Sequence, residues 1–81
     1  MDNMDKAKAI QIAAINSEIK NLRRKLGLNQ VEFAKRAGIG LRFLRELEQG
    51  KMSVRLDKLF LVVNFLGYHL ELKRNNYKET D

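Results

Sequence analysis

The chain has 81 residues and a mass of 9.4 kDa, which is room for one small domain, since a single core usually organises about 100–200 residues. It has no cysteine and a single histidine, His69, which excludes a disulfide framework, a thiolate metal site and a histidine-rich metal cluster. The 16 lysines and arginines outnumber the 10 acids and give a formal net charge of +6, so we expect a folded basic domain with an acidic partner.

The apolar residues are too interrupted to span a bilayer. The longest uncharged run, Leu59–Leu70, has about a dozen residues where the hydrocarbon core requires about 20. Asp2 and Asp5 stand where a secretory signal would carry positive charge. We therefore expect a cytoplasmic protein with no membrane partner.

The first predicted helix covers residues 17–27, where apolar side chains recur at helical spacing opposite a basic side. The apolar stripe extends backwards through Ile12, so this helix can begin as early as Asp5, within an N-terminal extension of residues 1–16. The alternation of apolar residues over 10–14 leaves a separate strand as the weaker alternative.

Two short helices are predicted next. Asn29 offers an N-cap oxygen for a helix over residues 30–37 that stops at Gly38. A third helix then runs to a C-terminal stop at Gly50. Its inward residues are expected to be Leu44 and Leu47, and its outward residues Leu41, Arg42, Arg45 and Glu46.

Ser53 is expected to cap a fourth helix that ends at Gly67. A wide apolar face is predicted on it, formed by Leu56, Leu59, Phe60, Val63 and Leu66.

The period then changes, because apolar and polar residues alternate strictly over residues 68–74, which indicates a half-buried β-strand. One strand in a helical chain has no mate, so we expect it to pair with the same strand of a second copy about a two-fold axis. His69 is expected to be a cross-strand neighbour, and residues 75–81 a polar tail. The predicted dimerisation residues are Leu66, Tyr68, Leu70 and Leu72.

The second and third helices have the spacing of a unit that presents a helix to the DNA major groove. Ala34 is small where the helices would cross, and Gly38 suits a turn that requires positive φ. With these features, Leu28–Ile39 and Leu44–Lys51 resemble the phage-repressor/Cro-type (XRE) helix-turn-helix family. Ser53–Lys73 resembles its HipB-like branch, in which the repressors serve as antitoxins of HipA-type kinase toxins.

The resemblance implies an all-α, lambda-repressor-like domain of five or fewer helices over residues 17–67, with the short C-terminal β-strand pairing across a homodimer. In such a dimer the two third helices enter successive major grooves of a palindromic operator, roughly 34–36 Å apart. The charge agrees, since residues 17–51 hold nearly all of the positive excess.

Several residues are candidates for DNA contact. Gln30 begins the second helix, where free N–H groups favour a phosphate, and the family's glutamine there clamps the backbone. Arg42 can reach guanine O6 and N7, Leu41 only a thymine methyl group, and Glu46 can accept from cytosine N4. The remaining candidates are Arg23 and Arg45, which could contact phosphate, with Gly40, Phe43 and Lys51.

Structural alternatives stay open for these residues. The arginines of the third helix could form only a solvated face, as could the basic side of the first helix. Phe43 either pads the groove between the second and third helices or lies against DNA. Glu48 is expected to pair with a nearby cation such as Lys35.

We therefore expect a sequence-specific, dimeric, DNA-binding transcriptional repressor, a HipB-like antitoxin that autoregulates a toxin–antitoxin operon and binds a HipA-like kinase toxin. The alternative is a protein-interaction module that binds its partner without touching DNA. No nucleophile, base and orienting group occur together, so we expect no enzyme, and we expect no metal or cofactor.

Overall fold

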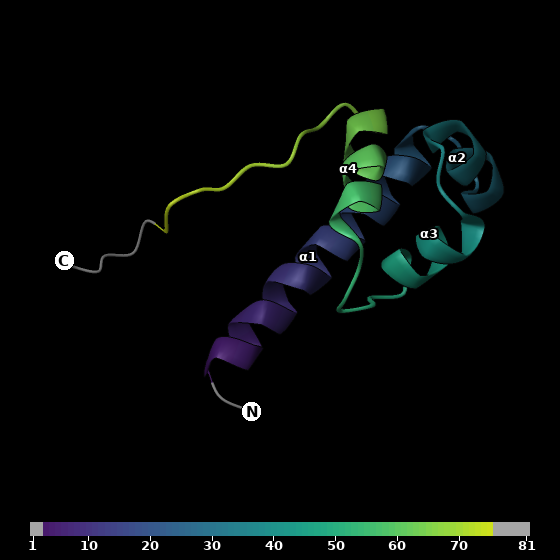
Figure 1. Ribbon diagram of the computed structural model, residues 1–81. Coiled ribbons are helices and arrows are strands. Elements are labelled where there is room, and N and C mark those ends of the chain that lie inside the picture. The colour runs from purple at the N-terminus through teal and green to yellow at the C-terminus, as the bar shows by residue number, and fades with distance from the viewer. Residues whose placement is uncertain (1–2, 76–81) are drawn as a thin grey trace.

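The computed structural model describes residues 3–75 and contains four helices and no strand within that range. The helices are α1 (Asn3–Lys25), α2 (Gln30–Ala37), α3 (Leu41–Glu48) and α4 (Leu56–Phe65). Figure 1 shows α2 and α3 side by side next to the C-terminal half of α1, with α4 close to both α1 and α2. No helix in the described range is long and apolar enough to cross a membrane.

Helix α1 is longer than the apolar stripe alone required. It begins at Asn3 and runs without a break past residue 16, so the backward extension of the helix is confirmed and the strand alternative over 10–14 is wrong. Its buried residues are Asn16, Ile19 and Arg23, which all lie in its C-terminal half. The first turns of α1 project beyond the other helices (Figure 1).

Local signals set the bounds of α2. The Asn29 side chain accepts a hydrogen bond from the Glu32 backbone N–H at 2.8 Å, and the Glu32 carboxylate accepts one from the Asn29 N–H at 3.1 Å. This reciprocal capping box satisfies two otherwise unpaired donors. At the other end Gly38 takes φ +79°, and the N–H groups of Gly38 and Ile39 both donate to the Ala34 carbonyl at 3.0 Å. The predicted helix over 30–37 and its glycine stop are confirmed.

The core lies where the four helices meet. Its fully buried large side chains are Phe33, Leu44, Leu47 and Val62. Phe33 of α2 packs edge-on against Phe65 of α4, with ring centroids 5.1 Å apart. An edge-to-face pair of this kind adds roughly 0.5–1.5 kcal/mol to the burial of the rings. The core therefore fixes the angle between α2 and α3 and braces both with α4.

The start and face of α4 differ from the sequence expectation. Ser53 is not the N-cap: the helix begins at Leu56, and the N-cap residue is Arg55. The half-buried Val54 packs against the core, so the chain stays extended past Ser53 before it can turn into the helix. The buried face is also rotated, because Val62 replaces Phe60 on it, and Leu56 and Phe60 are exposed.

The C-terminal segment is extended but is not a strand in the single chain. Residues 68–75 form neither helix nor strand, and the chain runs away from the end of α4 (Figure 1). The expected strand over 68–74 is therefore not formed, since a ladder requires a neighbouring strand and the described chain offers none. His69 pairs instead with Glu71, 2.8 Å from its Nε2. The predicted tail over 75–81 lies outside the described residues except for Asn75.

Candidate nucleic-acid interface

A buried ion pair joins α1 to the end of α3 and holds α3 in place. The Arg23 guanidinium donates from Nε to Glu48 Oε2 at 2.6 Å and from Nη2 to Glu48 Oε1 at 2.8 Å. Its Nη1 donates to the Leu28 carbonyl at 2.7 Å, in the turn before α2. The side chains of Arg23 and Glu48 are only 8% and 2% exposed. One guanidinium therefore ties together α1, the α1–α2 turn and α3.

The pKa values of this pair follow from its geometry. Burial alone would raise the pKa of Glu48, but the hydrogen bonds from Arg23 and Gln30 and the charge of Arg23 outweigh burial and hold that pKa below its usual range. The hydrogen bond to Glu48 raises the pKa of Arg23 against the opposing effect of burial. Both groups are thus charged at neutral pH. One expectation is corrected: Glu48 pairs with Arg23 and not with Lys35. Arg23 is buried and directs its donors to Glu48 and the Leu28 carbonyl, which makes a structural role the better account of it than a phosphate contact.

Gln30 lies at the first position of α2, as the sequence indicated. Its side-chain Nε2 donates to Glu48 Oε1 at 3.0 Å, so one of its two amide hydrogens is used inside the protein. The other amide hydrogen and the free N–H groups of the helix terminus are the donors that this end of α2 offers to an anion.

The outward face of α3 carries the predicted base-reading residues. Arg42 has a side chain 92% exposed, and Arg45, one turn further on, is also exposed. Leu41 does not join them: it is half-buried and packs against the core, because it shares the inward face with Leu44 one turn later. Leu41 is therefore a packing residue more than a reader of a thymine methyl group.

Glu46 lies among the cations of this face. Its Oε2 is 3.3 Å from Arg42 Nε and its Oε1 is 3.1 Å from Lys51 Nζ, with Lys51 just past the end of α3. The hydrogen bond from Lys51 has the largest effect on the pKa of Glu46 and lowers it, while burial opposes this shift. The charge of Lys51 and the hydrogen bond and charge of Arg42 lower the pKa further, so Glu46 is ionised at neutral pH.

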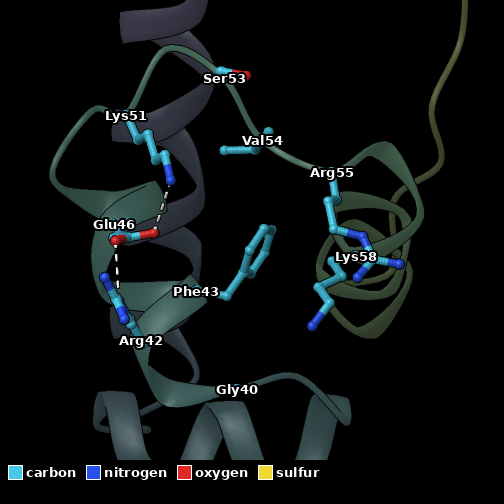
Figure 2. Close-up of a pocket in the computed structure, with 9 residues that line it drawn as sticks. All are labelled: Gly40, Arg42, Phe43, Glu46, Lys51, Ser53, Val54, Arg55 and Lys58. Atoms are coloured by element: carbon cyan, nitrogen blue, oxygen red, sulfur yellow. Dashed lines mark hydrogen bonds and ion pairs between the residues drawn. The ribbon is translucent and has the colours of Figure 1, made fainter.

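A hollow of about 370 Å³ separates α3 from the start of α4 (Figure 2). It is lined by Gly40, Arg42, Phe43, Glu46, Lys51, Ser53, Val54, Arg55 and Lys58. Figure 2 shows the Phe43 ring in the hollow, with Arg55 and Lys58 across from Glu46 and its two cations. Phe43 is half-buried against the core, and its ring centroid lies 6.0 Å from Lys58 Nζ of α4. The ring therefore lies between α3 and α4 rather than in the groove between α2 and α3, and its contact with DNA stays a prediction. Gly40 is the N-cap of α3 and caps it without a side chain.

Arg55 and Lys58 were missed as candidate site residues. Arg55 Nη2 pairs with Asp57 Oδ2 at 2.7 Å on the surface, and both cations flank the first turn of α4 on the side that faces α3. The sequence does show two cations close together near the start of a helix. They can be assigned to this site only once the start of α4 is known to be Leu56 and not the residue after Ser53.

Two short helices joined through a left-handed glycine, with the second helix braced from behind and cationic on its open side, define a helix-turn-helix domain. The helix-turn-helix family matches residues 19–73 of the chain. The chain is also similar to the uncharacterized HTH-type transcriptional regulator y4mF of Sinorhizobium fredii, with 36% identity over 67 residues that cover 82% of this chain and 88% of that protein. The chain belongs to the XRE-type helix-turn-helix family, as residues 28–51 indicated.

Proposed function

We propose that the protein is a sequence-specific, dimeric, DNA-binding transcriptional repressor of the cytoplasm. The observation that carries this proposal is the outward face of α3, where the exposed Arg42 and Arg45 stand on a helix whose angle to α2 is fixed by the core. The net charge of +6 supports an anionic partner. The relative y4mF is named as a transcriptional regulator, which supports the same function here.

In this proposal α3 enters the major groove and the surrounding cations contact the backbone. Arg42 has the length and the planar fork to contact guanine O6 and N7. Lys51, Arg55 and Lys58 border the hollow beside α3, where a sugar-phosphate strand would pass. Gln30 and the N-terminus of α2 would hold a phosphate on the opposite side of α3.

The proposed dimer places two such helices on a palindromic operator. Tyr68 and Leu72 are exposed in the single chain, and Leu72 is 100% exposed. Pairing of residues 68–74 with the same residues of a second copy would give hydrogen-bond partners to the backbone N–H and C=O groups of this segment and cover these side chains.

A role as a HipB-like antitoxin is the second part of the proposal and rests on the resemblance of Ser53–Lys73 to that branch. The proposed partner is a HipA-like kinase toxin, and the projecting part of α1, which exposes Met4 and Ile10, is the surface we propose for its contact. Co-purification with the product of a neighbouring kinase-like reading frame would test it. Stable binding to that kinase without binding to DNA would favour the pure interaction module instead.

Two variants test the DNA-binding proposal by gel shift, with the gene's own upstream region and a random duplex as probes. Arg42→Ala should reduce the difference in binding free energy between the upstream region and the random duplex by about 1–3 kcal/mol, the value of one bidentate contact with guanine. Lys58→Ala, the matched change at a proposed phosphate contact, should weaken both complexes alike and reduce the salt slope by about 1. Absence of any shift with the unmodified protein at physiological salt would overturn the proposal.

A further inference from the structure

Glu46 is the carboxylate on the exposed face of α3. The helix has two acidic residues, and the other, Glu48, is turned into the core to pair with Arg23. Glu46 instead lies 3.3 Å from the Arg42 guanidinium and 3.1 Å from the Lys51 ammonium, and it is one-third exposed. A carboxylate between two cations occupies the place that a DNA phosphate would take.

These contacts do little for the fold itself. Arg42 and Glu46 form an exposed pair four residues apart, and Lys51 is half exposed, so solvent screens both interactions. The helix is held by the buried residues Leu44 and Leu47 and by the pair between Arg23 and Glu48. The position of Glu46 therefore bears on the ligand of this face more than on folding.

From this arrangement we propose that Glu46 is a specificity-determining residue that suppresses binding to DNA of unmatched sequence. The inference rests on the proposed DNA-binding function and deepens it. On an unmatched duplex Glu46 keeps its ion pairs with Arg42 and Lys51, so these two cations do not pair with DNA phosphates. The negative charge of Glu46 also repels nearby phosphates and base acceptor atoms. On a matched duplex a base amino group, from cytosine or adenine, donates to Glu46, and Arg42 is released to its own acceptors. The charge of Glu46 thus acts against the wrong sequences and not against the right one.

The salt dependence of binding gives this inference a quantitative signature. Each cation that engages a phosphate adds about 0.9 to the slope of log affinity against log salt. Removal of the Glu46 charge frees two cations, so the slope on random duplex should steepen by up to about 1.8. Between 50 and 200 mM salt the variant's affinity should then fall about tenfold further than that of the unmodified protein.

The experiment compares Glu46→Gln and Glu46→Ala with the control Glu18→Gln. The control makes the same change in charge at an exposed position on α1, away from the recognition face. Fluorescence anisotropy would measure affinity, over a range of salt, for a duplex selected by the unmodified protein from a random-sequence pool and for a scrambled duplex of the same composition. Glu46→Ala has no side-chain amide, so it removes any new base contact that glutamine could make. Thermal melting would verify that each variant is folded.

Both Glu46 variants should bind the scrambled duplex more tightly than the control does, with the steeper slope, and the ratio of selected to scrambled affinity should fall by about fivefold or more. In an Arg42→Ala background the increase in affinity for the scrambled duplex should be smaller, because only Lys51 is then left for the loss of Glu46 to release. An unchanged ratio and slope, in a protein that does select a sequence, would overturn the role of Glu46 alone. If the unmodified protein selects no sequence and binds no duplex, the proposed function and this inference both fail.

Discussion

The buried pair between Arg23 and Glu48 should make Glu48 one of the most sensitive positions for stability. Glu48→Gln keeps the shape of the side chain but removes its charge and places an amide N–H group where an acceptor stood. Arg23 then remains buried at 8% exposure without a counter-charge, and Gln30 loses or shares its acceptor.

The expected loss can be estimated from the geometry. Both side chains are almost fully covered, the contact is a two-bond fork, and removal of one partner from a buried pair of this kind destabilises a protein by about 3–5 kcal/mol. A small domain has a total unfolding free energy of about 5–15 kcal/mol, so the variant loses a large part of it. Since each kcal/mol shifts Tm by about 4–8 °C at this size, we expect Tm to fall by at least about 12 °C.

Thermal and urea denaturation, followed by far-UV circular dichroism, would measure the effect. Glu71→Gln is the matched control, because it makes the same chemical change in an exposed pair with His69. We expect the control to change stability by no more than about 1 kcal/mol. In a double-mutant cycle, Arg23→Met should lessen the effect of Glu48→Gln, since the uncompensated charge is then absent.

A loss below about 1 kcal/mol for Glu48→Gln would contradict a buried, unscreened pair, because that is the value of a screened surface pair. So would additive effects in the cycle, since two residues that act through one contact must be coupled.

Three further outcomes are expected. The pKa of Glu48 is lower in the folded chain than in the unfolded chain, where it is about 4.3, so the unfolded chain takes up the proton first as the pH falls. The free energy of unfolding should therefore keep its full value above about pH 5 and decline below it. The urea midpoint of Glu48→Gln, which has no carboxylate at this position, should decline less over the same pH range. Gly38→Ala should destabilise the protein by about 1–2 kcal/mol in the same assay, because alanine is strained at φ +79°. No atom lies within 4 Å of the added methyl group, so a steric clash does not contribute. Gly38→Asn should lose less stability, since asparagine tolerates this conformation better, and equal losses would show that backbone strain is not the cause. Leu70→Pro removes a backbone donor from the proposed strand and should give a monomer in sedimentation, whereas a variant that stays dimeric would contradict strand pairing.

The sequence predicted the elements that short-range interactions determine. Asn29 and Glu32 are three residues apart and form the capping box by themselves, and Gly38 supplies the positive φ of the turn. The sequence alone therefore sufficed to predict the bounds of α2 and the helix-turn-helix unit. Ser53 shows the limit of such signals, since an N-cap residue was available but the packing of Val54 placed the helix start later.

The long-range contacts carried no comparable signal. Arg23 and Glu48 are 25 residues apart, and the sequence predicted a phosphate contact for Arg23 and a nearby cation such as Lys35 for Glu48, but not their contact with each other. Their pairing changed Arg23 from a candidate phosphate contact into a structural residue. The alternation over 68–74 was real in the sequence, but a strand requires a partner, and a single chain does not provide one.

Selection of binding sites from a random-sequence duplex pool tests whether α3 recognises a particular DNA sequence. The proposed function predicts enrichment of two inverted half-sites with centres one helical turn apart, about 10–10.5 base pairs, and loss of enrichment at one position of each half-site with Arg42→Ala. A pool that stays random after repeated rounds with the folded protein would contradict sequence-specific recognition of DNA by α3.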